Sequence, residues 1–516
     1  MEPDLTTLYD WATLELSISV IFCLYVAVHA YNQWRFALPG PIALPFIGNI
    51  FLMPFHKPWL TFTSWNVKYG DIIHLHGLRQ SIIVLNSKQT IDEFLEKRGN
   101  IYSHRPRYTV VGEMMGLDRG MPLLPYNYQW RLQRKLAKKA LSSLEVKKYH
   151  TTQTQLAALM CHSFITDPLH FRDHVRLAAG RIIMSITYGI PVSDAQHEYI
   201  THAERTMEMI SQATMPGAYM ADIFPFLKHL PSWLPFTSFR AEAQRGRAMI
   251  EHLVEQPFAN VVEGMLGGKA CPSFTSDLLS GPEASTDAYR HAIKWAAGSM
   301  YGAGGESTYA TILVFIVCMA QNISVQEKAQ KELDQVIGSD RLPTIEDRER
   351  LPYVEVVIKE VLRWRPALPL GIPRRLDCED SYAGSRITPN SIVIPNVWAI
   401  AMTVNQNYPA SDFVPERFLE EHPPIDPSLY AFGFGRRICP GKLLAENSLF
   451  LLVASILYSC TISPPMSIGE TGNKLNVKFT TGLVSYPLPF DCSIQPRSLE
   501  RSDVIQRIAT EGGFAI

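Results

Sequence analysis

The segment Phe432–Gly441, with the sequence FGFGRRICPG, constrains the fold of this chain more than any other feature. Its glycines give the backbone access to conformations that a Cβ forbids, and they let backbone amides approach whatever the loop binds. One cysteine, Cys439, follows them. Pro440 then fixes φ where a helix is predicted to begin, near Gly441. We therefore expect a tight loop that holds one sulfur atom close to the start of a helix.

The full spacing Phe-x-x-Gly-x-Arg-x-Cys-x-Gly, which begins at Phe432, predicts a thiolate ligand for a haem iron. A cysteine thiolate is a strong axial electron donor that favours O–O cleavage, and loop amides would tune its donor strength. Arg437 lies two residues before Cys439, where its guanidinium is suited to a charge-assisted bond with a haem propionate. The alternative is a glycine-rich turn with an ordinary buried cysteine, which the complete spacing disfavours.

This loop resembles that of the cytochrome P-450 family of haem-thiolate monooxygenases, in particular its microsomal, fungal members. Four more motifs occur in the family's order between Leu38 and Phe490: Trp130-x-x-x-Arg134, Ala/Gly-Gly-x-Glu-Ser ending at Ser307, Glu360-x-x-Arg363 and Pro415–Phe418. The resemblance implies the family's fold, mainly α with small β-sheets (α+β), and a haem b cofactor. It also implies that NADPH and flavins act only indirectly, through a reductase.

Trp130 and Arg134 are four residues apart, so they share one helical face. The resemblance implies that this face holds the haem edge and its propionates, with Phe432 and Arg374 also at the cofactor. A second stripe of the same helix is basic and consists of Arg131, Lys135, Lys138 and Lys139. It is either a solvated face or the docking site of an acidic reductase.

The segment Ala303–Thr308, with Gly302 just before it, carries three glycines, each costing about 1 kcal/mol in a helix relative to alanine. They predict a groove for O2, and close helix packing is the alternative. Glu306, Ser307 and Thr308 are the candidate catalytic residues, because an acid beside an alcohol relays the protons that oxygen activation consumes. Family members usually have Asp-Thr where this chain has Glu306-Ser307.

Glu360 and Arg363 are i, i+3 neighbours on a predicted helix, a common pair worth only tenths of a kcal/mol alone. As a family motif, the pair implies a buried ion network with Arg417 that supports the segment before the cysteine loop. One stretch departs from the family pattern. Ile400–Asn405 replaces a His-Arg-Asp-Pro-like run, which puts any haem-edge contact there in doubt.

Residues 1–37 are predicted to form an N-terminal signal anchor with a juxtamembrane segment, and residues 38–516 a single haem-thiolate monooxygenase domain. Leu16–Ala30 is apolar and uncharged, and acidic residues precede it, which points the N-terminus away from the cytosol. We therefore expect a single-pass protein of the endoplasmic reticulum membrane with a cytosolic catalytic domain. The net charge of −1 does not favour nucleic acid, and eight scattered cysteines do not suggest a zinc site.

Strands are expected near residues 72–75, 81–85, 392–395 and 482–486, with long helices over 177–188 and 288–321. By position in the family, the substrate pocket is expected along residues 108–124, 297–305, 367–372 and 483–484, with Met114, Met115, Met300 and Tyr301 among its lining. This lining is mostly apolar and suits a hydrophobic molecule. The segment 215–236 either dips into the bilayer or is a proline-broken stretch of core.

The predicted activity is insertion of one atom of O2 into a lipophilic small molecule, such as a terpenoid or another fungal secondary metabolite. The expected electron donors are an NADPH–cytochrome P-450 reductase and cytochrome b5. A reductase-independent haem-thiolate isomerase or dehydratase is one alternative, and Glu306-Ser307 speaks against it. A non-catalytic haem-binding sensor is another, and it would need neither an oxygen groove nor a proton relay.

Overall fold

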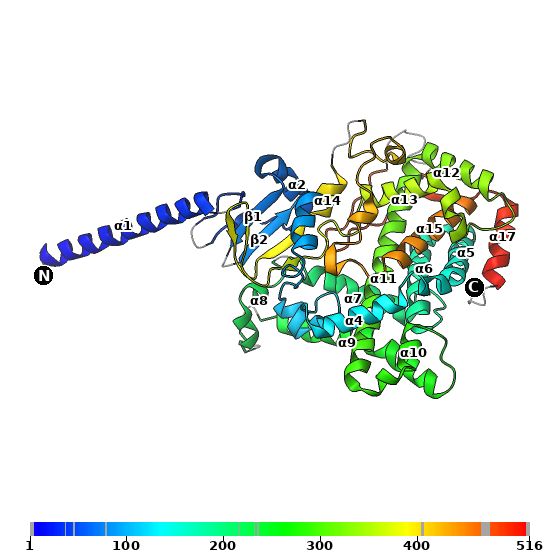
Figure 1. Ribbon diagram of the computed structural model, residues 1–516, viewed down its shortest axis with the longest axis horizontal. Coiled ribbons are helices and arrows are strands. Elements are labelled where there is room, and N and C mark those ends of the chain that lie inside the picture. The colour runs from blue at the N-terminus through cyan, green and yellow to red at the C-terminus, as the bar shows by residue number, and fades with distance from the viewer. Residues whose placement is uncertain are drawn as a thin grey trace.

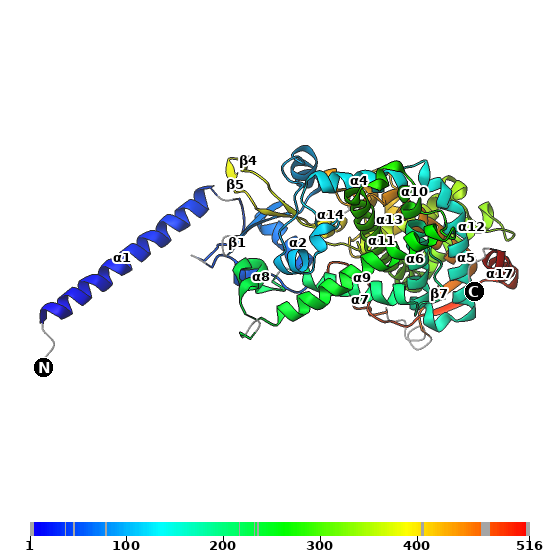
Figure 2. The ribbon, with the colours of Figure 1, turned by 90° about the horizontal axis from the view of Figure 1, so that it is seen from below.

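The computed structural model describes residues 5–36, 38–44, 47–77, 80–215, 217–231, 233–234, 237–403, 407–465 and 475–511. Helices form most of the body, and a small sheet lies at the end from which the first helix, α1 (Leu5–Phe36), projects (Figure 1). Seen from below, α1 still stands clear of the body (Figure 2). This arrangement confirms the predicted mainly α fold with small β-sheets.

The described helices after α1 are α2 (Pro58–Tyr69), α3 (Lys88–Ile91), α4 (Tyr128–Ala140), α5 (His150–Thr166), α6 (Phe171–Tyr188), α7 (Glu198–Ala213), α8 (Met220–Ile223), α9 (Phe239–Leu266), α10 (Phe274–Leu279), α11 (Asp287–Gln321), α12 (Ile323–Val336), α13 (Pro352–Trp364), α14 (Val397–Ala401), α15 (Lys442–Ser459) and α17 (Leu499–Glu511). A π-helical segment, η3 (Thr109–Met114), follows Tyr108.

The main sheet has the strand order β1 (Ile72–Gly77), β2 (Gln80–Leu85), β6 (Ile392–Pro395) and β3 (Arg374–Arg375). β1 and β2 are antiparallel, whereas β2 and β6 are parallel. Alternate residues of these strands are buried in two separate apolar clusters, one on each face of the sheet, as the two-residue period of a strand requires. β6 also pairs with β3 in antiparallel fashion, which fixes Arg374 and Arg375 at the end of this sheet.

Two smaller two-stranded sheets complete the fold, β4 (Asp380–Tyr382) with β5 (Ser385–Ile387) and β7 (Cys460–Ser463) with β8 (Ser493–Pro496). The strands expected near residues 72–75, 81–85 and 392–395 are confirmed. The strand expected over residues 482–486 is wrong. That segment is a bend, because its N–H groups are used locally and by other elements: the Tyr486 amide bonds Thr480 Oγ1, and the Leu483 amide bonds Ser211 Oγ.

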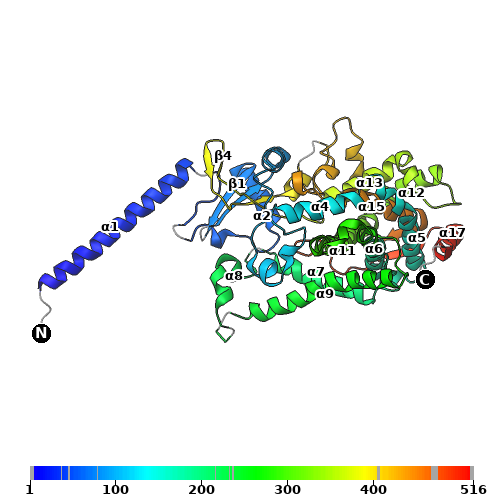
Figure 3. The same ribbon diagram turned by 60° about the horizontal axis from the view of Figure 1, so that its bottom comes forward.

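The long helix α11 runs through the middle of the helical layer, with α4 on one side and α7 and α9 on the other (Figure 3). Thr286 caps its N-terminus by accepting a hydrogen bond from the Tyr289 amide. Its 35 residues span about 52 Å, and those from Thr308 to Ala320 are all buried. α11 is thus a central, buried helix of the fold, and the candidate catalytic residues Glu306, Ser307 and Thr308 lie at its middle.

Two described helices, α11 and α15, are long and apolar enough to cross a membrane, but 72% and 78% of their apolar windows are buried inside the protein. They are therefore core helices. Thr13–Val28, within α1, is a shorter apolar helix whose side chains are mostly exposed. In the stretch Ile400–Asn405, which departs from the family pattern, residues 400–401 are the end of α14 and residues 402–403 follow it. Val404 and Asn405 lie outside the described residues.

Candidate haem site

The cysteine loop is closed by its own backbone and by a neighbouring helical segment. The Cys439 amide donates to the Phe432 carbonyl at 2.8 Å, which brings the two ends of the loop together. Gly433 and Gly435 have φ angles of +79° and +53°, the left-handed region that favours glycine. A Cβ on Gly435 would also clash with the backbone carbonyl of Leu95. The predicted steric need for glycine is therefore confirmed at these two positions.

The sulfur of Cys439 lies just before α15, whose N-terminal cap is Gly441. Burial raises the pKa of this thiol, whereas a hydrogen bond from the Gly441 amide and the charge of Arg134 lower it. The amide donor that the sequence predicts is therefore present. A metal cation in front of the sulfur would shift the balance to the thiolate, because coordination deprotonates a thiol.

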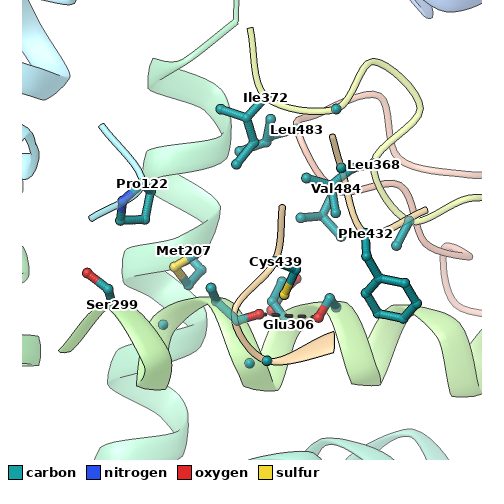
Figure 4. Close-up of a pocket in the computed structure, with 18 of the residues that line it drawn as sticks. Pro122, Met207, Ser299, Glu306, Leu368, Ile372, Phe432, Cys439, Leu483 and Val484 are labelled. Carbon is teal, nitrogen blue, oxygen red and sulfur yellow. Dashed lines mark hydrogen bonds between the residues drawn. The ribbon is translucent and has the colours of Figure 1, made fainter. Parts of the chain in front are cut away.

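A cavity of about 430 Å³ opens in front of this sulfur. Its walls come from the middle of α11, the chain over residues 367–374, the cysteine loop with the start of α15, and residues 481–484. Figure 4 shows Cys439 among the lining residues, with Pro122, Met207 and Ser299 toward one side and Phe432 toward the other. The lining is mostly apolar, as expected.

Four arginines, Arg105, Arg134, Arg374 and Arg437, line the same cavity. Among the described residues, no carboxylate forms an ion pair with any of them. Burial and the other three arginines hold the pKa of Arg374 well below its usual range, and burial with repulsion from Arg105 and Arg134 lowers that of Arg437 to about 8. Buried like charges without a counter-ion are destabilising, so a bound anion would stabilise this arginine cluster.

Arg374 gives the clearest test of that fit. One of its N–H groups donates to the Phe434 carbonyl at 3.0 Å. Its Nε and Nη1 atoms are buried without a partner among the described residues. A buried charged donor without an acceptor is strongly disfavoured. The two propionates of haem b would supply the missing negative charge, so these residues fit the cofactor.

Arg437, which is predicted to bind a haem propionate, lines the cavity and also makes bonds within the protein. Its guanidinium donates to the backbone carbonyls of Ser103, Met121 and Leu124 at 2.6 to 3.1 Å. It also stacks on the Trp130 ring, 4.4 Å from the ring centroid. Arg437 thus ties the cysteine loop to α4 and to the chain before it, and most of its donor capacity is already used within the protein.

Two of the predicted glycines of α11, Gly302 and Gly304, pack against neighbouring helices. A Cβ on Gly304 would lie 2.7 Å from Ile183 of α6, and one on Gly302 would lie 3.1 Å from Met207 of α7. The close-packing alternative therefore accounts for these two glycines, although both also line the cavity, and the predicted groove for O2 stays a prediction. α11 is an uninterrupted helix here. Ala303, one residue away, is exposed to the cavity and lines it.

Glu306, Ser307 and Thr308 all line the cavity. Ser307 and Thr308 donate to the carbonyls of Ala303 and Gly304 at 3.3 and 3.0 Å. Glu306 is mostly buried, and burial raises its pKa while Arg176 opposes the rise. The predicted acid and alcohols therefore meet at one wall of the cavity.

The predicted ion network is present and buried. Glu360 accepts two hydrogen bonds from Arg363, at 2.6 and 2.7 Å, and one from Arg417 at 3.0 Å. All three side chains are at most 3% exposed. The two guanidiniums also donate to backbone carbonyls between Ala401 and Val414. The network thereby fixes the chain that leads into the cysteine loop.

The sequence reasoning missed Arg105 and misplaced three pocket residues. Arg105 donates to the carbonyls of Pro122, Ile372 and Pro373 and lines the cavity. It stands in a short irregular stretch, so no helical or strand period indicates its direction. Met114, Met115 and Tyr301 do not line the cavity, whereas Met300 does. Met115 packs in a separate apolar cluster, and Tyr301 donates to the Tyr199 carbonyl.

A macrocycle with a central metal and two carboxylates satisfies the sulfur and the arginines together, so fold and site define a haem-thiolate protein. The family model for cytochrome P-450 matches residues 38–490. The chain belongs to this family. It is an oxidoreductase of the monooxygenase type, and its cofactor is haem b.

Several curated fungal monooxygenases are similar over nearly the whole chain. Cytochrome P-450 monooxygenase claR of Ampulloclitocybe clavipes is 38% identical over 484 residues, which cover 92% of this chain and 89% of the relative. Cytochrome P-450 monooxygenase 208 of Postia placenta is 36% identical, covering 93% and 94%. Cytochrome P-450 monooxygenase COX2 of Coprinopsis cinerea is 35% identical, with the same coverage.

Proposed function

We propose that this monooxygenase inserts one atom of O2 into a lipophilic small molecule of the terpenoid or secondary-metabolite kind, with electrons from an NADPH-dependent flavoprotein reductase. The observation that carries the proposal is the cavity, where Cys439 and a mostly apolar lining occur together with the acid and alcohols of α11. When bound, the haem supplies the iron that activates oxygen. The apolar walls orient the substrate and exclude bulk water.

The residues of the chain are proposed to deliver the protons. Glu306 is linked to Arg176 of α6 at 3.4 Å, and Arg176 is linked at 2.9 Å to Glu204 of α7, which is 44% exposed. The three side chains form a continuous path from the surface to the cavity wall. Ser307 and Thr308 stand at its inner end, where a hydroxyl passes a proton onward.

The basic stripe of α4 supports docking of the reductase. Arg131, Lys135, Lys138 and Lys139 are exposed, as expected. Arg134 of the same helix is close enough to Cys439 to affect the pKa of its thiol, so the stripe lies on the cysteine side of the cavity. An acidic partner is attracted to such a surface, and cytochrome b5 is proposed to share it.

We propose further that residues 1–37 anchor residues 38–516 to the endoplasmic reticulum membrane, with the catalytic domain in the cytosol. The apolar side chains of Thr13–Val28 are exposed, and Phe51, Phe55, Phe226 and Trp233 are more than half exposed on the body. Gly217 contacts Phe55, so the segment after α7 adjoins the chain before β1. These two segments support one apolar face toward the bilayer.

Reconstitution with a flavoprotein reductase tests the activity. We expect NADPH to be consumed only when the reductase is present, and one atom of ¹⁸O from ¹⁸O2 to enter the product of a lipophilic substrate. Conversion of an oxygenated substrate without NADPH, and without label from O2, would support the isomerase or dehydratase alternative instead.

A further inference from the structure

Most hydroxyl groups on the oxygen-side wall of the cavity are already used by the protein. Thr214 donates to the Ile210 carbonyl, Ser299 to the Trp295 carbonyl and Thr308 to the Gly304 carbonyl, all at 2.7 to 3.0 Å. In each case the acceptor lies four residues back in the chain, a common arrangement for hydroxyls in helices. In the structure, each of these hydroxyl hydrogens is directed to a helix carbonyl.

Tyr108 differs from them. Its side chain lines the cavity, and among the described residues no acceptor takes its phenol proton. Burial raises the pKa of Tyr108 to about 12, so the phenol remains a hydrogen-bond donor at neutral pH. It packs at the edge of an apolar cluster that includes Leu123, Ile210 and Trp295.

Trp295 brings a second unused donor to the same wall. Its side chain is 2% exposed, and its indole N–H is buried without a partner among the described residues. The ring lies under the guanidinium of Arg119, at 4.6 Å, and the residue also lines the cavity. Tyr108 is partly buried and lines the cavity, so an acceptor carried by a ligand could pair with its phenol without displacing a bond within the protein.

We infer that Tyr108 donates a hydrogen bond to an oxygen atom that the substrate already carries, and that the substrate is an oxygenated apolar molecule rather than a hydrocarbon. The inference rests on the proposed function, because it concerns the same cavity. The acceptor is an alcohol, ether or carbonyl oxygen, since each of these accepts a hydrogen bond from a neutral phenol and suits a mostly apolar cavity. The reaction that supplies this substrate must therefore be one that installs such an oxygen.

Ligand binding to the full chain loaded with haem tests the inference. Three matched pairs of probes differ only by one carbonyl: decalin and 2-decalone, cyclododecane and cyclododecanone, and 5α-androstane and 5α-androstan-3-one. Affinities are measured by equilibrium dialysis for the wild type, Tyr108→Phe and Tyr219→Phe. Tyr219 is the matched control, because its phenol donates to Glu242 and does not line the cavity.

For at least one pair we expect Tyr108→Phe to weaken ketone binding about 5- to 10-fold, the value of one neutral hydrogen bond, and to leave hydrocarbon binding unchanged. Tyr219→Phe should alter neither. If Tyr108→Phe changes ketone and hydrocarbon binding equally in all three pairs, the inference is overturned. The reconstitution assay of the wild type separates this failure from failure of the proposed function, because NADPH use and ¹⁸O incorporation by the wild type do not depend on which group Tyr108 contacts.

Discussion

Arg176 of α6 and Glu306 of α11 form an ion pair of 3.4 Å in which each side chain is only 13% exposed. Arg176 also stacks on Tyr309, 3.8 Å from the ring centroid, and pairs with Glu204 at the surface. The acid at the oxygen side is therefore not isolated. It is one end of a charged path across two helix interfaces, and that path makes its role testable.

Replacing Glu306 with glutamine keeps its size but removes the proton it would transfer. We expect product formation to fall about 100-fold or more, because a positioned acid or base contributes at least that much. The haem spectrum should not change. Glu204→Gln is the matched control at the exposed end of the path, where water substitutes for the carboxylate, and a smaller loss is expected. Turnover of Glu306→Gln at the wild-type rate would exclude the carboxyl from proton delivery.

Arg374 should stabilise the haem-bound protein and destabilise the protein without haem. Arg374→Met removes a buried charge that has two unpaired donor atoms. We therefore expect the apoprotein to melt at a higher temperature and haem to be released more readily, as followed by transfer to apomyoglobin. Arg386→Met, an exposed arginine on β5, should change neither quantity. A variant that keeps haem as tightly as the wild type would remove Arg374 from the cofactor site.

The buried network around Glu360 should be costly to break. Glu360→Gln leaves two guanidiniums, each at most 3% exposed, without their carboxylate. The expected loss is about 3–5 kcal/mol of unfolding free energy, measured by denaturant titration. The exposed pair of Glu379 with Arg386 gives the comparison, and Glu379→Gln should cost less than about 1 kcal/mol. Equal losses in the two variants would contradict a supporting role for the network.

His74 on β1 should make stability depend on pH. Burial, with a smaller effect of His76, lowers the pKa of His74 from 6.5 to about 4. Between pH 6.5 and about 4, His74 is protonated in the unfolded chain but not in the folded chain. The free energy of unfolding therefore falls as the pH drops through this range. The whole pKa shift corresponds to about 3 kcal/mol of unfolding free energy. Because His74 is partly exposed, we expect a measured loss of about 1–3 kcal/mol.

Denaturant titrations across that pH range measure the effect of His74. The dependence of unfolding free energy on pH should diminish in His74→Gln. Glutamine keeps a polar group near Ser81 Oγ, which lies 3.0 Å from His74 Nε2 in the wild type. The dependence should persist in His422→Gln, a change at an exposed histidine. An unchanged slope in His74→Gln would assign the pH dependence to other groups.

Much of the site could be predicted because its chemistry depends on local spacing. The cysteine loop, the Glu360 network and the α11 residues each lie within short motifs whose residue types leave few alternatives. Arg105, Arg176 and Glu204 could not be predicted in this way. Their roles arise where helices and irregular segments far apart in sequence meet, and one sequence contains no signal for such contacts. The packing of Gly302 and Gly304 against α7 and α6 shows the same limit, since a glycine pattern alone does not distinguish a groove from a close contact.

The most direct test of the account is the carbon monoxide difference spectrum of dithionite-reduced membranes that contain the full chain and, in parallel, its Cys439→Ser variant. We expect a strongly red-shifted Soret band for the wild type, as a thiolate ligand requires, and loss of that band in the variant. A band at the unshifted position in the wild type, or the same red-shifted band in Cys439→Ser, would show that Cys439 is not the thiolate ligand and would contradict the assignment.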